Sequence, residues 1–212
     1  MNRKVVYQAS MLAAIVAFVC ALLLGFVFRA PDPGLSLQPV QPGPLADFLK
    51  PINNYPDLML RAFASDSLFV ISYLMVFVGL HATVAERART LAAVGLGAGI
   101  LTAIFDATEN AYFVTYALST LNGAPVTQPE LPAIYVIANL KWMAAFITLA
   151  AFGLAWPRND GLGRLMTALM LIFPLFGVLS VAVQGLVPFR GLFFFVGMPL
   201  FAWHFYRQAR AG

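Results

Sequence analysis

Charged residues are scarce in this chain. Only 10% of its 212 residues are Asp, Glu, Lys or Arg, whereas a soluble domain has roughly 25%. Hydrophobic residues make up 61%, above the roughly 45–50% of soluble domains. A soluble protein of this length must cover its exterior with polar side chains, whereas lipid accepts Leu, Phe, Val and Ala there. The composition therefore predicts an integral membrane protein with membrane lipid as its surroundings.

Cysteine and the common catalytic motifs are also missing. Cys20 is the one cysteine, which excludes an intrachain disulfide and a cluster of Cys ligands. The chain has no His-Glu-x-x-His, Gly-x-Ser-x-Gly or Walker sequence, so common zinc, acyl-transfer and nucleotide chemistries lack their residues. No metal site or cofactor is predicted. The net charge of +4 arises from Lys and Arg scattered at segment ends, which argues against a nucleic-acid partner.

Long apolar segments predict an all-α, polytopic protein that forms one transmembrane domain over residues 1–212. A span needs about 20 apolar residues. About six predicted spans cover residues 7–28, 57–84, 91–118, 131–156, 162–183 and 191–206. Pro174 and Pro199 fall inside the fifth and sixth spans, where each removes a backbone hydrogen bond and is expected to kink its helix.

A Pro-rich segment, residues 31–56, separates the first two spans and is predicted to be an external loop, because proline disfavours a long helix. Within it, an i, i+3, i+4, i+7 spacing predicts a short amphipathic helix carrying Leu45, Phe48, Leu49 and Ile52. This helix either lies on the membrane surface or caps the bundle.

Basic residues beside the spans predict the orientation. One side holds eight of them: Arg3, Lys4, Arg87, Arg89, Arg158, Arg164, Arg207 and Arg210. The other side holds four: Arg29, Lys50, Arg61 and Arg190. Because cytoplasmic flanks carry the excess of Lys and Arg, both termini are predicted to be cytoplasmic, in a bacterial inner (plasma) membrane.

The third span contains two acids and an amide, Asp106, Glu109 and Asn110. Each acid costs at least ~2.5 kcal/mol at the centre of a transmembrane helix, so it must be paired, protonated or hydrated. At about 100° per residue, Asp106 and Asn110 share a stripe with small residues, and Glu109 lies beside it. The small residues of that stripe are Gly95, Gly99 and Ala103. Small residues allow close helix contact, so this face is predicted to point into the bundle.

Lys141 in the fourth span lies at the depth of Glu109 to within about a turn, which makes it the predicted partner of Glu109 or Asp106. Two acids and one base leave a surplus carboxylate, which is protonated, hydrogen-bonded to Asn110 or exposed to water.

The second and fourth spans offer further polar residues. Asp66 and Tyr73 share one stripe of the second span and are expected to join the cluster. Asn139 and Trp142 lie largely opposite Lys141 on their helix and are not placed in the same pocket.

Three functions fit this cluster. The first is a transporter, channel-like protein or receptor that binds or translocates a small polar or charged ligand or a proton. Its predicted site contains Asp66, Tyr73, Asp106, Glu109, Asn110 and Lys141. The second is a membrane-embedded enzyme or binder for a lipid-like molecule, with Glu109 or Asp106 as acid or base and Lys141 as electrostatic stabiliser. The third is an accessory or structural subunit of a membrane complex, in which the cluster is a polar clasp that fixes helix register.

Two histidines, His81 and His204, fall near span ends predicted to be cytoplasmic and could hold a haem between them. The alternative is an interface anchor formed by the aromatic run of residues 203–206, because amphipathic rings gather at membrane–water boundaries.

Overall fold

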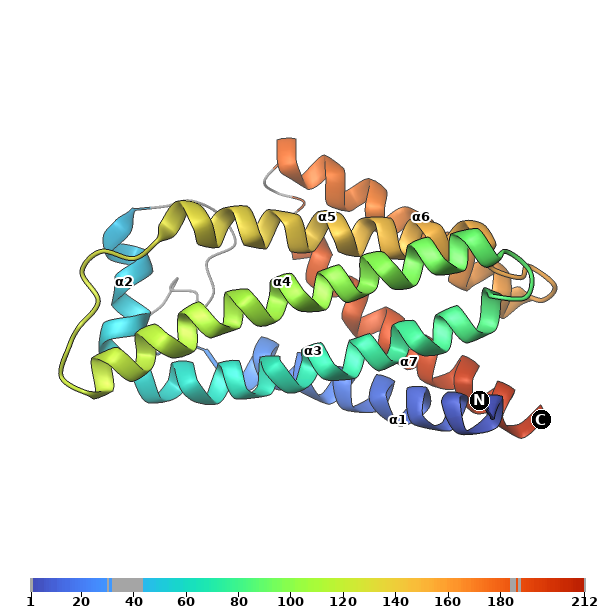
Figure 1. The fold of residues 1–212 in the computed structure, drawn as a ribbon, viewed down its shortest axis with the longest axis horizontal. Coiled ribbons are helices and arrows are strands. Elements are labelled where there is room, and N and C mark those ends of the chain that lie inside the picture. Colours follow the sequence, from blue (N-terminus) through green and yellow to red (C-terminus); the bar gives the residue numbers. More distant parts are fainter. Residues whose placement is uncertain (1, 30, 32–43, 184–185, 187, 212) are drawn as a thin grey trace.

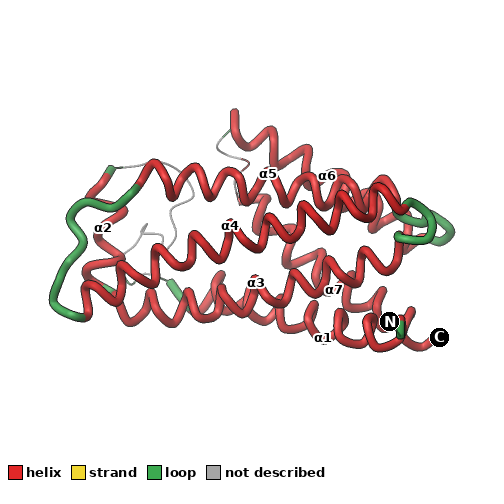
Figure 2. The backbone as a smooth tube through the Cα atoms, viewed as in Figure 1, coloured by secondary structure: helices red, strands yellow, loops and turns green. Residues whose placement is uncertain are grey.

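A computed structural model of the chain describes residues 2–29, 31, 44–183, 186 and 188–211 (Figure 1). These residues form helices and no strands (Figure 2), as the sequence predicts. The elements are α1 (Arg3–Leu22), the π-helical continuation η1 (Leu23–Val27), α2 (Leu45–Asn54), α3 (Pro56–Val84), α4 (Arg89–Leu121), α5 (Leu131–Ala155), α6 (Gly161–Ala182) and α7 (Pro188–Ala211).

Five helical segments are long and apolar enough to cross a membrane: α1 with η1, α3, α4, α5 and α6. Large apolar side chains stand on their outer faces, as at Ile71, Leu175 and Val181, each more than 60% exposed. Lipid stabilises such a surface, which water would not. The composition and these five helices indicate a multi-pass membrane protein; by the same criteria, applied to the described residues, α7 is not among the five.

The six long helices form a ring in the order α1, α3, α4, α5, α6, α7, in which each packs on the next and α7 returns to α1. The contact between α6 and α7 is the least extensive in the ring. Figure 1 shows both ends of the chain beside the α3–α4 and α5–α6 connections, with α2 and the α4–α5 connection at the opposite end. Arg3 on α1 pairs with Glu86 at 2.6 Å, which ties the start of the chain to the α3–α4 connection.

Asp160 organises the same end of the molecule. Its Oδ1 accepts a hydrogen bond of 2.7 Å from the backbone N–H of Gly163 and thereby caps α6. Its Oδ2 pairs with Arg207 of α7 at 3.0 Å. The Gly163 N–H and the Arg207 guanidinium hold the pKa of Asp160 below its usual range. The start of α6 is therefore tied to the last turns of α7.

The short helix α2 caps the opposite end of the bundle. Phe48 and Ile52 are buried at 2% and 0% exposure, and the Phe48 ring lies 5.7 Å from that of Phe113 on α4. Of the two placements left open for this helix, the structure has the cap. Pro51 lies inside α2, so this part of the Pro-rich segment is helical and not extended. Residues 32–43 of the predicted loop lie outside the described residues.

The small-residue stripe of α4 faces the interior, as predicted. An ideal Cβ on Gly95 would lie 2.8 Å from a ring carbon of Phe152, and one on Gly99 would lie 2.6 Å from a ring carbon of Phe77. Ala103 continues the stripe and is buried. Gly97 is on another face, and a Cβ there would meet nothing within 4 Å. Close packing along this stripe brings the acids of α4 to the inside of the ring.

Candidate functional site

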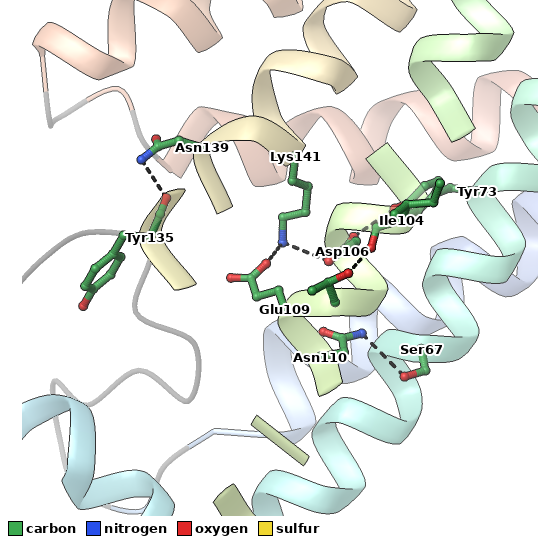
Figure 3. A network of polar contacts seen from close by, with 10 residues as sticks. Ser67, Tyr73, Ile104, Asp106, Glu109, Asn110, Tyr135, Asn139 and Lys141 are labelled. Atoms are coloured by element: carbon green, nitrogen blue, oxygen red, sulfur yellow. Dashed lines mark hydrogen bonds and ion pairs between the residues drawn. The ribbon is translucent and has the colours of Figure 1, made fainter. Parts of the chain in front are cut away.

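Lys141 of α5 reaches both acids of α4 (Figure 3). Its Nζ lies 2.9 Å from Oδ1 of Asp106 and also contacts Oε2 of Glu109. Asp106 and Glu109 are three residues apart and lie on adjacent turns, so one ammonium group can reach both. The exposure of Asp106 is 6% and that of Glu109 is 2%. The predicted ion pair is therefore present, and it includes both candidate partners.

Tyr73 of α3 donates a hydrogen bond of 3.0 Å to the second oxygen of Asp106 (Figure 3). Its ring is held between Phe69 and Phe77, whose centroids lie 5.2 Å and 5.4 Å away. The carboxylate of Asp106 thus accepts from a tyrosine on α3 and a lysine on α5, and it joins three helices at one point.

Lys141 contacts both acids of α4, so neither is left over for Asn110. The Nδ2 of Asn110 lies 3.5 Å from Oγ of Ser67 on α3, a long contact, and its Oδ1 is buried without a hydrogen-bond partner. Asp66 of α3 adds a further acid to the cluster; it is 7% exposed, and its Oδ2 is buried without a hydrogen-bond partner. A buried polar oxygen left in this way is costly unless a proton, water or ligand reaches it.

A cavity of about 340 Å³ lies among the helices of the ring, within the size range of small-molecule sites. Its polar lining residues are Asp66, Tyr73, Thr102, Asp106, Lys141 and Arg190. Most of the remaining wall is aromatic or aliphatic and includes Phe69, Phe77, Trp142, Phe193 and Phe194. Glu109 lies behind Lys141 and is not part of the lining. Of the residues predicted for the site, Asp66, Tyr73, Asp106 and Lys141 therefore share one cavity.

Arg190 is the main residue that the sequence interpretation missed. The sequence predicts a basic flank of the last span at this position, yet Arg190 is only 7% exposed and lines the cavity. The helical period contains a signal for this position, because Arg190 shares one face of α7 with Phe193, Phe194 and Phe201. Phe193 and Phe201 are fully or nearly fully buried.

Trp142 corrects a second expectation. It lies in the cavity wall with Lys141, although it was placed on the opposite side of the helix. The cavity is also lined by residues of α4, α6 and α7, so a broad part of the α5 surface faces it. Asn139 does face away, as expected: it is exposed and donates a 2.9 Å hydrogen bond to the carbonyl of Tyr135 (Figure 3).

His204 packs against the Trp156 ring at a centroid distance of 4.8 Å, and its Nε2 lies 3.4 Å from Oγ1 of Thr83. Trp203 is 54% exposed, as suits an interface anchor. Within the described residues there is no group of three or more His, Cys, Asp or Glu side chains that could hold a metal ion. A haem between His81 and His204 stays a prediction.

No protein-family model, curated protein or solved structure matches the chain. The fold and composition define its class, a multi-pass α-helical membrane protein. Any assignment within that class depends on the cavity and the charges that line it.

Proposed function

We propose that this protein binds a small amphipathic ligand in the central cavity and moves it together with a proton. The observation that carries the proposal is the buried, unpartnered Oδ2 of Asp66 in the wall of a cavity that also contains the Asp106–Lys141 pair. A site that exchanges both a ligand and a proton needs room beside a carboxyl oxygen that has no hydrogen-bond partner.

The balance of charge supports a proton at this site. Lys141 already contacts two carboxylates, and Asp66 adds a third acid nearby. Three ionised carboxylates against the Lys141 ammonium and the Arg190 guanidinium leave one excess negative charge inside a membrane, and one proton removes it. Lys141 of α5 and Tyr73 of α3 both bind Asp106. Protonation of Asp106 would therefore alter contacts with both helices.

The wall of the cavity supports an amphipathic ligand. Polar groups gather on the α3–α4–α5 side, while phenylalanine rings from α3, α6 and α7 form much of the rest. Aromatic walls with a few convergent polar groups are typical of sites for organic molecules, and a bare inorganic ion gains little from them. The ligand therefore has an apolar body and a polar end.

A lipid-directed enzyme is the second candidate, and the apolar lining favours it. Asp106 or Glu109 would act as acid or base and Lys141 as electrostatic stabiliser, but both carboxylates already bind that lysine. The third candidate, an accessory subunit of an oligomer or larger complex with a polar clasp, needs a dry and fully paired cluster. The unpartnered oxygen of Asp66 beside a cavity argues against it.

We propose that α7 is the sixth span, that Pro174 and Pro199 kink α6 and α7, and that both termini are cytoplasmic in a bacterial inner membrane. Both ends of the chain lie at one end of the bundle (Figure 1). The basic residues near those ends and near the two adjacent connections outnumber those at the opposite end, as the positive-inside rule requires.

Reporter fusions test this topology. A fusion after Phe28 should report the external side and a fusion at Gly212 the cytoplasm, because an odd number of spans precedes the first site and an even number precedes the second. Alkaline phosphatase activity and fluorescence of a cytoplasmic reporter distinguish the two sides. The same side for both fusions would contradict a sixth span.

Infrared spectroscopy tests the proton on Asp66. The wild-type protein should show a carboxylic-acid C=O band that disappears as the pH rises and shifts in D₂O, because the cavity connects the group to exchangeable protons. Asp66→Asn should remove this band. The matched control is Asp57→Asn, which changes an exposed acid at the start of the same helix. A wild-type protein without such a band, or a band that survives in Asp66→Asn, would refute proton binding at Asp66.

A further inference from the structure

We propose that the ligand of the cavity carries an anionic group, a carboxylate or a phosphate, and that Arg190 binds this group. The inference rests on the proposed function, because it concerns the same cavity and names the class of ligand. It assigns the ligand's charged end to a residue on α7, on a different helix from the proton site on α3.

Arg190 is a buried cation without an acidic partner among the described residues. Its Nε donates to Oγ of Ser180 at 2.7 Å and its Nη2 to the carbonyl of Gly177 at 3.4 Å, and both acceptors are neutral. A guanidinium has five N–H donors, so these two bonds leave others available. A buried charge that lacks a counter-ion is costly, and an anion delivered by a ligand would remove that cost.

The guanidinium is held in place before any ligand arrives. It lies over the Trp142 ring, 5.2 Å from the centroid, and over the Phe146 ring at 5.9 Å. Cation–π contacts of this kind fix the plane of the group, and the bond to Ser180 fixes its position. A planar, oriented guanidinium matches the paired oxygens of a carboxylate or phosphate better than an ammonium does.

The first turn of α7 supplies room and further favourable charge beside Arg190. Gly191 also lines the cavity, and a Cβ added to it would meet nothing within 4 Å. Arg190 and Gly191 are the third and fourth residues of α7, in the first turn, where the helix dipole favours an anion. The buried arginine, the open space and the helix start therefore coincide.

The other cation in the cavity is a poorer anion site. Lys141 is already bound by Asp106 and Glu109, and a further anion there would face Asp66 as well. Repulsion from these carboxylates directs an anionic group toward Arg190. The transported pair would be the anionic ligand, bound at Arg190, and one proton, bound at Asp66. Their charges cancel, which favours movement of the pair through a largely apolar cavity.

Bromoalkyl probes of one length and two head groups test this inference. Bromine quenches tryptophan fluorescence on contact, and Trp142 lies in the cavity wall. The protein in lipid nanodiscs is titrated with 10-bromodecanoate or 10-bromodecan-1-ol at a pH at which the carboxylate is ionised. The part of the quenching that is absent in Trp142→Phe reports binding in the cavity. The carboxylate should bind about tenfold or more tightly than the alcohol, since hydrogen bonds to charged groups contribute about 1.5–3 kcal/mol.

Arg190→Gln should abolish the preference for the carboxylate, measured as the ratio of the two affinities, while Arg190→Lys should restore part of the preference. Arg210→Gln is the matched control, because Arg210 also lies over an aromatic ring, at 5.3 Å from that of Tyr206, but is exposed near the C-terminus. Equal wild-type affinities, or a preference that survives in Arg190→Gln, would overturn the anionic ligand and leave the cavity function standing. If neither probe quenches Trp142, ligand binding in the cavity fails, and this inference fails with it.

Discussion

Replacing Lys141 by Met should lower the free energy of unfolding by about 3–5 kcal/mol, because Asp106 and Glu109 would stay buried without their counter-ion. Glu109→Gln removes one acid and should cost less than the loss of the lysine. In Lys141→Met/Glu109→Gln, part of the loss should be recovered, since fewer unpaired charges remain. Unfolding of the four proteins in detergent gives the coupling energy from a double-mutant cycle.

A second cycle, with Asp106→Asn, separates the two acids. Asp106 also accepts the Tyr73 hydrogen bond, so its substitution should cost more than that of Glu109. Additive effects in both cycles would show that Lys141 is not energetically paired, whatever its position. Large coupling with ligand binding unchanged in every stable variant would identify the cluster as a structural clasp and remove the functional proposal.

The second large effect is expected at the small-residue stripe of α4. Gly99→Leu should sharply reduce the folded yield, because even a Cβ would lie 2.6 Å from a ring carbon of Phe77 and leucine adds three more carbons. Overpacking typically costs 1–3 kcal/mol and sometimes more. The Phe77 ring lies beside Tyr73, so its displacement would also disturb the hydrogen bond to Asp106. Size-exclusion chromatography and thermal unfolding in detergent measure the effect.

Gly97→Leu is the control on the same helix. It makes the same substitution two residues away, where a Cβ would meet nothing within 4 Å. Yield and melting temperature should be close to those of the wild type, because the leucine side chain enters open space. Equal behaviour of the Gly97 and Gly99 variants would mean that the stripe is not a helix–helix contact.

The sequence alone predicts those features that depend on one helix at a time, such as where a helix lies and which face carries its polar residues. Apolar segment length predicted the helices, and the period of α4 put Asp106 on the face of Gly95 and Gly99. Lys141 followed because a buried acid needs a partner and few cations occur at the right depth. The spacing that starts at Leu45 predicted α2, but only the packing against Phe113 shows what its apolar face covers.

The burial of Arg190 and the position of Trp142 in the cavity wall depend on how α6 and α7 pack against α5 and against each other. Arg190 stands near the start of α7, and counting charges at span ends treats such a residue as exposed. Its burial results from Ser180 and Trp142, which belong to two other helices. Trp142 follows Lys141 by one residue, about 100° around the helix, so a broad cavity bordering α5 takes in both. The period of α7 places Arg190 on the face of Phe193 and Phe201, but its contacts with Ser180 and Trp142 cannot be obtained from one helix.

The position of Arg190 has a mechanical consequence. Asp106 joins α3, α4 and α5 through its bonds to Tyr73 and Lys141. The contact between α6 and α7 is the least extensive in the ring, and it includes the bonds from Arg190 to Ser180 and Gly177. An anion bound to the remaining N–H groups of Arg190 leaves those bonds in place and lies beside the contact between α6 and α7. The charged end of the cargo would therefore be held where the ring has its least extensive contact, while the opposite half of the ring is joined through Asp106.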